Sequence, residues 1–341
     1  MKKHNSDMTG EILTINKNNY LIGAVVIGRN EGSRLIACLK SLSQLSEQIV
    51  YVDSGSTDHS IADAKALDIQ VLALDLTQPF TAARARNAGA EHLLMIYPDI
   101  QYIQFVDGDC AIDSNWLNKA LEFLQHNSTV AAVCGRRRER FPENSIYNYQ
   151  CDLEWNTPVG EAKACGGDCL IRVSAFKVVN GYRDNLIAGE EPEMCLRLRG
   201  LGWKIWRIDA EMTLHDANIL KFNQWWRRSL RTGYAYAEGA NLHGSTKERH
   251  WVRESIRAVV WGILLPITIL ILATFITRYA VFLVLIYPLQ WLRIVNQHKN
   301  LHKKYGLSLL LVLSKFAEGF GLMKYLFIKL FNQRGELIEY K

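Results

Sequence analysis

The chain has 341 residues, 49% apolar and 22% charged, which excludes a disordered protein and is enough for one large domain or two smaller ones. Its net charge is +6, but it contains no zinc-finger spacing, aromatic RNA-binding strand or helix-turn-helix pattern, so we expect no nucleic-acid partner. Basic residues gather instead around an apolar tail, where anionic lipid is the better expectation. The seven scattered cysteines predict free buried thiols in a reducing compartment.

Strand and helix patterns alternate through the first 130 residues. Short apolar runs rich in β-branched residues predict strands at 21–27, 49–52, 71–74 and 102–106. Apolar residues at helical spacing predict a helix after each strand. Strands joined by helices in this way predict an α/β fold with a mixed, mostly parallel sheet covered by helices.

The pattern is less regular after residue 130. Residues 131–160 read as a strand followed by irregular chain, 166–172 as a strand entering a helix, 190–201 as a helix and 203–208 as a short strand. We therefore expect a polar extension at 1–19, without a signal peptide, and a catalytic domain at 20–220.

A hydrophobic tail follows this domain. Residues 258–276 are 19 consecutive positions without a charge. As a helix they would be about 28 Å long, close to the thickness of a bilayer core. Residues 279–292 are again uncharged. We expect an interfacial helical linker at 221–257, a transmembrane or membrane-inserted hairpin at 258–294, and an amphipathic surface helix at 305–331. A buried soluble hairpin and a shallow, non-crossing hairpin are the alternatives.

Basic residues predict the orientation of this hairpin. Four precede its first uncharged run and four follow its second, whereas Arg278 alone lies at its tip. The flanking residues are Lys247, Arg249, Arg253, Arg257, Arg293, Lys299, Lys303 and Lys304. By the positive-inside rule, both ends and the catalytic domain lie in the cytoplasm, at the plasma or inner membrane.

Acidic residues follow three of the predicted strands. Glu31 follows the first, Asp53 the second, and Asp107 and Asp109 the fourth. Ligands of parallel sheets bind beyond the carboxyl ends of the strands. A departing nucleoside diphosphate needs a divalent cation, and hard cations prefer oxygen ligands, so Asp107-x-Asp109 is a candidate metal motif.

A second acidic cluster opens the predicted helix at 190–201. Glu190, Glu191 and Glu193 could supply a general base for an acceptor hydroxyl. Acidic residues and Pro192 also suit a first helical turn for purely structural reasons.

Seven short motifs occur in one order over residues 20–215. They are VVIGRNE at 25–31, VDSGSTD at 52–58, ARNAG at 85–89, VDGD at 106–109, GGD at 166–168, Gly181-Tyr182, and EEPE at 190–193. Together they resemble the family 2 inverting glycosyltransferases, which have the GT-A (Rossmann-like) fold.

The resemblance implies a role for each matching position. Asp53 would hold the nucleotide base, with uracil expected, and Glu31 would lie beside the nucleoside. Arg86 would lie near the donor diphosphate or sugar. Asp107 would contact the ribose or sugar, and Asp109 would bind Mg²⁺ or Mn²⁺.

Other positions would serve the acceptor. Gly167 and Asp168 would border it, and Glu191 aligns with the base, where the family usually has aspartate; Glu190 and Glu193 are its rivals. His215 and residues 224–228 are similar to segments the family uses near the diphosphate. We nevertheless favour an interfacial helix with Trp and Arg at headgroup level for 224–228.

The sequence thus predicts a metal-dependent, membrane-associated hexosyltransferase. Its donor would be a nucleoside-diphosphate sugar, with UDP expected, and its acceptor a lipid-linked or polysaccharide glycan of envelope or exopolysaccharide biosynthesis. Addition of single sugars is favoured, because two spans are few for an export channel. A nucleotidyltransferase lacks its expected Gly-rich basic loop after the first strand. A non-catalytic membrane scaffold is the other alternative, which the intact Asp-x-Asp motif disfavours.

Overall fold

The computed structural model describes residues 21–331. Its sheet begins with four parallel strands in the order β3-β2-β1-β4. Their bounds are β1 Ile22–Gly28, β2 Ile49–Asp53, β3 Gln70–Ala73 and β4 Tyr102–Asp107. Gly28 is in register with Asp53, and Ile27 with Asp107, so the acidic ends of β2 and β4 flank the end of β1 at one sheet edge.

Antiparallel pairing extends the sheet beyond β4. β8 (Cys169–Arg172) pairs with β4 and with β6 (Val130–Glu139), and β6 runs parallel to β9 (Lys204–His215). The short strands β5 (Cys110–Ile112) and β7 (Gly160–Ala162) pair with β9. The strand predicted at 203–208 is longer than expected, because register shifts in β6 let β9 follow it to His215.

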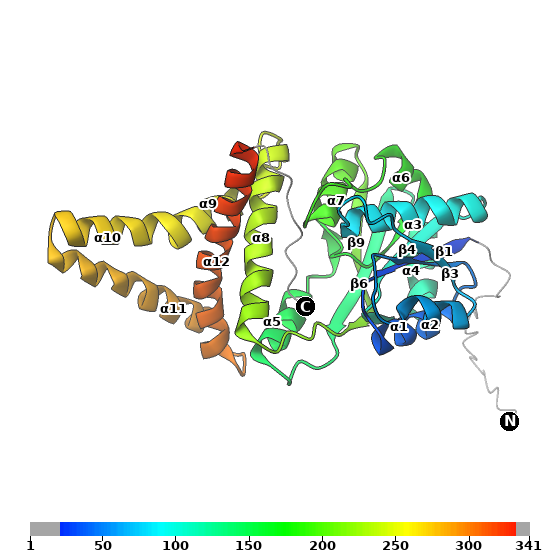
Figure 1. The fold of residues 1–341 in the computed structure, drawn as a ribbon, viewed down its shortest axis with the longest axis horizontal. Helices are drawn as coiled ribbons and strands as arrows, with labels where there is room; N and C mark the ends of the chain where they lie inside the picture. Colours follow the sequence, from blue (N-terminus) through cyan, green and yellow to red (C-terminus); the bar gives the residue numbers. More distant parts are fainter. Residues whose placement is uncertain (1–20, 332–341) are drawn as a thin grey trace, which may run out of the picture.

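Helices cover both faces of the sheet (Figure 1). One face carries α1 (Ser33–Ser43), α2 (Ser60–Ala66) and α4 (Trp116–His126). The other carries α3 (Ala82–Ile96), α6 (Val173–Val178) and α7 (Glu190–Gly200). The fold class is therefore the predicted one, a mixed α/β sheet between two helical layers.

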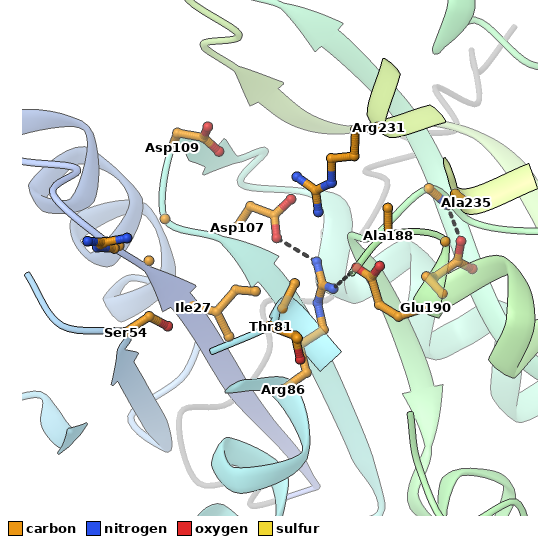
Figure 2. A pocket seen from close by; sticks show the side chains of 18 of the residues that line it. Ile27, Ser54, Thr81, Arg86, Asp107, Asp109, Ala188, Glu190, Arg231 and Ala235 are labelled. Atoms are coloured by element: carbon orange, nitrogen blue, oxygen red, sulfur yellow. Dashed lines mark hydrogen bonds and ion pairs between the residues drawn. The ribbon is translucent and has the colours of Figure 1, made fainter. Parts of the chain in front are cut away.

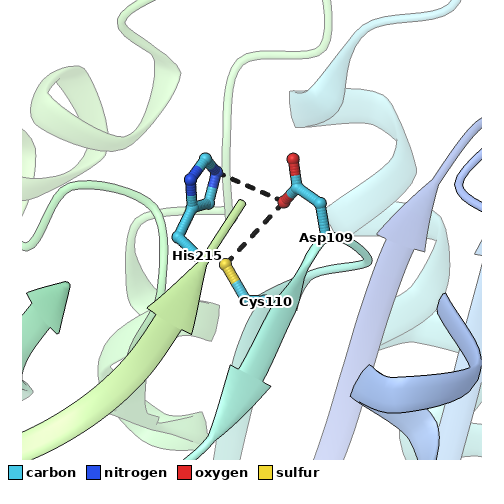
Figure 3. A group of neighbouring side chains, drawn as sticks. All are labelled: Asp109, Cys110 and His215. Atoms are coloured by element: carbon cyan, nitrogen blue, oxygen red, sulfur yellow. Dashed lines mark hydrogen bonds and ion pairs between the residues drawn. The ribbon is translucent and has the colours of Figure 1, made fainter. Parts of the chain in front are cut away.

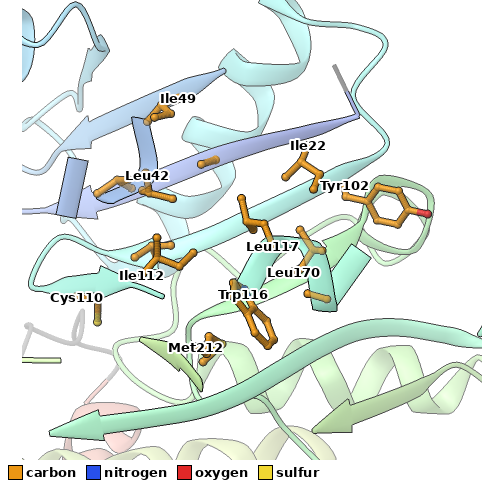
Figure 4. Packing of buried hydrophobic residues seen from close by; sticks show 14 of the residues in the cluster. Ile22, Leu42, Ile49, Tyr102, Cys110, Ile112, Trp116, Leu117, Leu170 and Met212 are labelled. Carbon is orange, nitrogen blue, oxygen red and sulfur yellow. The ribbon is translucent and has the colours of Figure 1, made fainter. Parts of the chain in front are cut away.

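The core under α4 shows how the sheet is packed. Trp116 is fully buried and lies with Leu117 over side chains from several strands (Figure 4). Its indole Nε1 donates to Oε1 of Gln104 at 2.8 Å, so this buried polar pair is satisfied.

The interpretation of residues 131–160 as strand and irregular chain is wrong for their second part. Residues Ile146–Glu154 form helix α5. The Ser145 side chain caps it by accepting from the backbone N–H of Asn148. The helix buries Cys151 against Ile219 and Trp225, a distant segment, which explains why its local pattern was weak.

The chain after the sheet is helical. α8 (Phe222–His243) leads to a continuous helix, Val252–Phe275, made of α9 (Val252–Val259), a π-helical turn (Val260–Leu264) and α10 (Leu265–Phe275). After Thr277 the chain returns through a 3₁₀ segment (Arg278–Leu285) and α11 (Ile286–Gln297). Together, α10 and α11 project away from the sheet (Figure 1).

The last helix, α12 (Lys304–Leu330), differs from this hairpin. Val252–Phe275, Arg278–Gln297 and Lys304–Leu330 are each long and apolar enough to cross a membrane. The apolar window of α12 is 56% buried within the molecule, against 17% and 11% for the other two. The hairpin therefore presents its apolar surface outwards, whereas α12 packs against α8.

Glycines allow α8 and α12 to meet backbone to backbone. A Cβ on Gly321 would lie 1.9 Å from the carbonyl oxygen of Leu230, and one on Gly233 would lie 2.0 Å from that of Glu318. No larger residue fits either position without separating the helices.

Candidate functional site

A cavity of about 800 Å³ opens at the carboxyl ends of β1 and β4, between the sheet edge, the start of α7 and one face of α8. Among the predicted site residues, Glu31, Arg86, Asp107, Asp109, Gly167, Glu190 and Glu191 line it. Five separate segments of the sequence thus meet in one cleft (Figure 2). Asp53 and Asp168 do not belong to its lining.

Arg86 joins two acidic residues on the floor of this cavity. Its Nη1 lies 2.7 Å from Oε1 of Glu190, and its Nη2 lies 2.7 Å from Oδ1 of Asp107. Burial alone lowers the pKa of this guanidinium, but the charges of Asp107 and Glu190 raise it above its ordinary value. Arg86 is therefore a fixed positive charge at the base of the cleft.

Asp109 lies at the turn after β4, beside the end of β9. His215 Nε2 is 3.3 Å from Asp109 Oδ1, and both residues line the cavity (Figure 3). Cys110 Sγ lies 3.8 Å from the same oxygen and 3.4 Å from Asp168. His215 Nδ1 is buried without a hydrogen bond. A carboxylate and an imidazole at one edge fit a divalent cation such as Mn²⁺, with Asp107 contributing a second carboxylate nearby.

Asp53 is almost fully buried at the end of β2. Its carboxylate accepts hydrogen bonds from the backbone N–H groups of Gly55 and Ser56 and from the Tyr51 hydroxyl. Burial first, and then the Asp53 charge, raise the pKa of Tyr51. Asp53 shapes the turn that brings Ser54 to the cavity wall, whereas Glu31 lines the cavity itself and pairs with Arg34 at 2.7 Å.

The three glutamates of α7 have separate environments. Glu190 pairs with Arg86. Glu191 is 2% exposed, and its two oxygens accept from the backbone N–H groups of Cys165 and Gly166 at 2.7 and 2.9 Å. Glu193 is ion-paired with Arg183 and Arg197 and lies outside the cavity lining. Only the first two can therefore reach a substrate in this cavity.

The contacts of Glu193 indicate a structural role. The Arg197 guanidinium and His243 outweigh the effect of burial and lower the pKa of Glu193. The carboxylate therefore holds the start of α7 against the chain around Arg183 and against α8.

Gly167 and Asp168 are adjacent in sequence but lie in different environments. Gly167 has a φ of 106° and lines the cavity; a Cβ there would come within 3.3 Å of Arg86 Nη2. Asp168 is fully buried below it, paired with Arg137 at 2.8 Å and accepting from the Thr213 hydroxyl and the backbone N–H of Asp107. Asp168 thus supports the end of β4 from beneath.

Most of one cavity wall is missing from the sequence-based prediction, which considered only Arg228 of α8, as part of 224–228, for a place near the diphosphate. Arg228, Arg231, Thr232, Ala235 and Tyr236 of α8 line this wall, together with Trp251. Arg231 points towards Asp107 and Arg86 (Figure 2). The spacing of these α8 residues places them on one helical face, a signal that could have been read from the sequence.

The headgroup interpretation of residues 224–228 is wrong for two of its members. Trp225 is 1% exposed and donates to Gln150 at 3.0 Å inside the protein. Arg228 pairs with Glu154 and faces the cavity. Packing against α5 and α12, rather than lipid, accounts for this part of α8.

The seven cysteines are free, as predicted. Six are buried and Cys165 is partly exposed. Burial first raises the pKa of the Cys38 and Cys110 thiols, in keeping with unreactive core positions.

The mixed sheet with acidic residues at its strand ends agrees with the GT-A-like fold that the resemblance implied. Residues 24–179 match the sequence profile of Glycosyl transferase family 2. Over these residues, somewhat under half of its length, the chain is similar to this family.

Two similar proteins illustrate the relationship. The succinoglycan biosynthesis protein ExoA of Rhizobium meliloti is 28% identical over 198 residues, which cover 53% of this chain and 58% of ExoA. The chain thus matches somewhat over half of that relative. A mannosyltransferase from Pyrobaculum calidifontis, solved in complex with GDP-Man and Mn²⁺, has a TM-score of 0.62 at 15% identity, covering 91% of this chain and 88% of the other. At this identity the likeness concerns the fold.

Proposed function

We propose that the chain is an inverting hexosyltransferase that moves a sugar from a nucleoside-diphosphate donor to a membrane-associated acceptor. The observation that carries the proposal is the shared cavity of Asp107, Asp109, Arg86 and the first two residues of α7. Across it, the carboxylates of Asp107 and Asp109 lie on one side of the Arg86 guanidinium, and the carboxylates of Glu190 and Glu191 lie on the other. This is the charge pattern that a diphosphate, a cation and an acceptor hydroxyl require together.

The donor would lie over the ends of β1 and β4. Glu31 and the turn at Ser54 would border the nucleoside, and Asp107 the ribose or sugar. Arg86 and the α8 arginines, Arg228 and Arg231, would face the diphosphate. Arginine suits this role because its planar group remains charged and binds phosphate oxygens in pairs.

Asp109, with His215 and Asp107 beside it, would hold Mg²⁺ or Mn²⁺. When bound, the cation supplies positive charge that stabilises the departing diphosphate. The protein's own contribution is to fix the Asp109 carboxylate in the turn after β4.

Inversion needs a base on the side of the sugar opposite the nucleotide. Glu191, the position implied by the resemblance, is our first candidate, because its hydrogen bonds to Cys165 and Gly166 hold it rigidly at the cavity wall. Glu190 is the second candidate, being the more exposed of the two, although its pairing with Arg86 favours an electrostatic role.

The acceptor would be lipid-linked or part of a growing polysaccharide, as in envelope or exopolysaccharide synthesis. The relationship to a succinoglycan biosynthesis protein and the outward-facing apolar hairpin support this. The hairpin would place the catalytic part at the cytoplasmic face of the plasma or inner membrane, with Arg278 outside. Labelling of a cysteine introduced at Arg278 in intact cells tests that topology.

A donor screen tests the function itself. Purified full-length protein is incubated with UDP- and GDP-sugars, with and without chelator, and released nucleoside diphosphate is measured. We expect one donor class to be turned over in a metal-dependent way, and Asp109→Ala to abolish that turnover with the fold intact. Turnover that survives both chelator and Asp109→Ala would contradict the site assignment.

A further inference from the structure

A second cavity, of about 780 Å³, lies beside the first, where α9 begins the apolar helix Val252–Phe275. Its walls come from the segment after β7, from both ends of α7, and from the chain that leads into and begins α9. Five cations line it, against two acidic residues, Glu248 and Glu254. The cations are Lys163, Arg199, Arg249, Arg253 and Arg257.

Most of this positive charge is uncompensated. Arg199 is neutralised by Glu248 through two hydrogen bonds, at 2.9 and 2.7 Å. Among residues 21–331, Lys163, Arg249, Arg253 and Arg257 form no ion pair within 4.0 Å. The N-terminus of the long helix beginning at Val252 adds the positive end of its dipole. The cavity is therefore suited to a compact, multiply charged anion.

The two cavities share a wall. Pro192 and Trp251 line both of them. A Cβ on Gly189 would lie 2.4 Å from the Trp251 ring, as would one on Gly239, so two glycines form the slot that the indole fills. His250 stacks on Trp251 with ring centroids 4.2 Å apart, and Tyr236 meets it edge-on at 5.4 Å.

Trp251 is also held in a strained backbone conformation. Its φ is 53°, and a bulky residue in the left-handed region is costly unless its surroundings impose it. The strain places a flat aromatic surface between the catalytic cavity and the cationic one. Such a surface suits the apolar face of a sugar ring.

We propose that the second cavity binds the phosphate or diphosphate of a lipid-anchored acceptor. The lipid would lie along the hairpin that begins at Val252, and the sugar would pass Trp251 to reach Glu191 and Glu190. This inference rests on the proposed function and names the acceptor class. It explains why cations without ion-pair partners, the start of an apolar helix and a wall shared with the first cavity occur together.

The test is a binding measurement that does not depend on transfer. Full-length protein in neutral detergent is titrated with farnesyl diphosphate in chelator, which removes the metal-dependent donor site from the measurement. Two variants change opposite walls: Arg253→Gln with Arg257→Gln, and Lys163→Gln alone. The matched control is Arg293→Gln with Lys299→Gln, the same charge change at the other end of the hairpin.

We expect wild-type protein to bind farnesyl diphosphate more tightly than inorganic diphosphate, and the double variant to lose about tenfold or more in affinity, equal to about 1.4 kcal/mol. Lys163→Gln is expected to lose affinity too, and the control to bind like wild type. Unchanged affinity in both cavity variants, or an equal loss in the control, overturns the proposal. So does a loss confined to binding of phosphatidylglycerol nanodiscs, which would identify bulk anionic lipid. Nucleotide binding by wild-type protein, measured separately with UDP and GDP, reports on the proposed function.

Discussion

The Nη1 atom of Arg86 on α3 lies 2.7 Å from Oε1 of Glu190, the first residue of α7. Its other terminal nitrogen reaches Asp107 at the end of β4. This one side chain therefore connects the parallel half of the sheet to the segment that carries the candidate base. A planar guanidinium can make both contacts at once, which a lysine ammonium on a flexible stem cannot reproduce.

Arg86→Lys is expected to lower transfer about a hundredfold, since loss of one charge-assisted contact corresponds to about 2–3 kcal/mol. Unfolding in denaturant should show a smaller loss of stability, because the buried charge is retained. The matched control is Arg84→Lys on the same helix, whose guanidinium bonds only to backbone carbonyls away from the cavity. Equal transfer rates for the two variants would contradict a role for Arg86 in the site.

Glu191→Gln tests the base. The new amide must turn an N–H group towards the backbone N–H of Cys165 or Gly166, so one hydrogen bond is lost and the loop is weakened. We expect transfer to fall by about 10²–10⁴ while the donor nucleotide still binds.

Glu190→Gln provides the comparison. It retains an oxygen for Arg86 but removes a charge, so the expected change is in donor affinity more than in the rate at saturation. Titration of donor against both variants separates the two roles. Normal turnover by Glu191→Gln, with a rate loss confined to Glu190→Gln, would transfer the base assignment to Glu190.

Gly321→Ala tests the contact between α8 and α12. The added methyl group would lie 1.9 Å from the Leu230 carbonyl oxygen and 2.8 Å from the Tyr234 nitrogen, both backbone atoms that cannot rotate away. We expect a loss of about 1–3 kcal/mol in stability. Transfer should fall as well, because α8 carries one wall of the cavity. Thermal unfolding and donor turnover in detergent measure both effects.

Gly200→Ala is the control for that substitution. Gly200 ends α7, and an added Cβ would meet nothing within 4 Å. Alanine there should be neutral or stabilise by up to about 1 kcal/mol. If Gly321→Ala changed stability and turnover no more than Gly200→Ala does, the close contact between α8 and α12 would be contradicted.

Glu238 on α8 makes stability depend on pH. Burial raises its pKa to about 7, so between about 4.5 and 7 the folded protein holds a proton that the unfolded chain has lost. This contribution is complete at low pH and is lost as pH rises through 7. Glu238→Gln should therefore stabilise the protein above pH 7, with the gain shrinking towards pH 5. Unfolding midpoints at several pH values measure it, and parallel curves for the two proteins would contradict it.

Local chemistry explains why much of the sheet could be predicted. β1, β2 and β4 are buried apolar runs whose residues match the predicted strands within one position, and each is followed by turn residues. Because parallel strands end at one edge, Asp53 and Asp107 had to lie near each other. The short strands β5 and β7 carry no comparable signal, since three residues show no periodicity and depend on β9 for pairing.

The sequence by itself determined the α/β class, the acidic sheet edge, the free cysteines and the apolar hairpin, since each depends on periodicity, turn chemistry or composition within a short segment. The tertiary structure alone decided which of those side chains share a space. It buried Asp53 and Asp168 outside the cavity lining, tied Glu191 to the backbone at Cys165 and Gly166, and brought Arg231 and Trp251 into the wall. These outcomes depend on contacts between segments far apart in the chain, such as the glycine-lined crossing of α8 and α12, which no local pattern encodes.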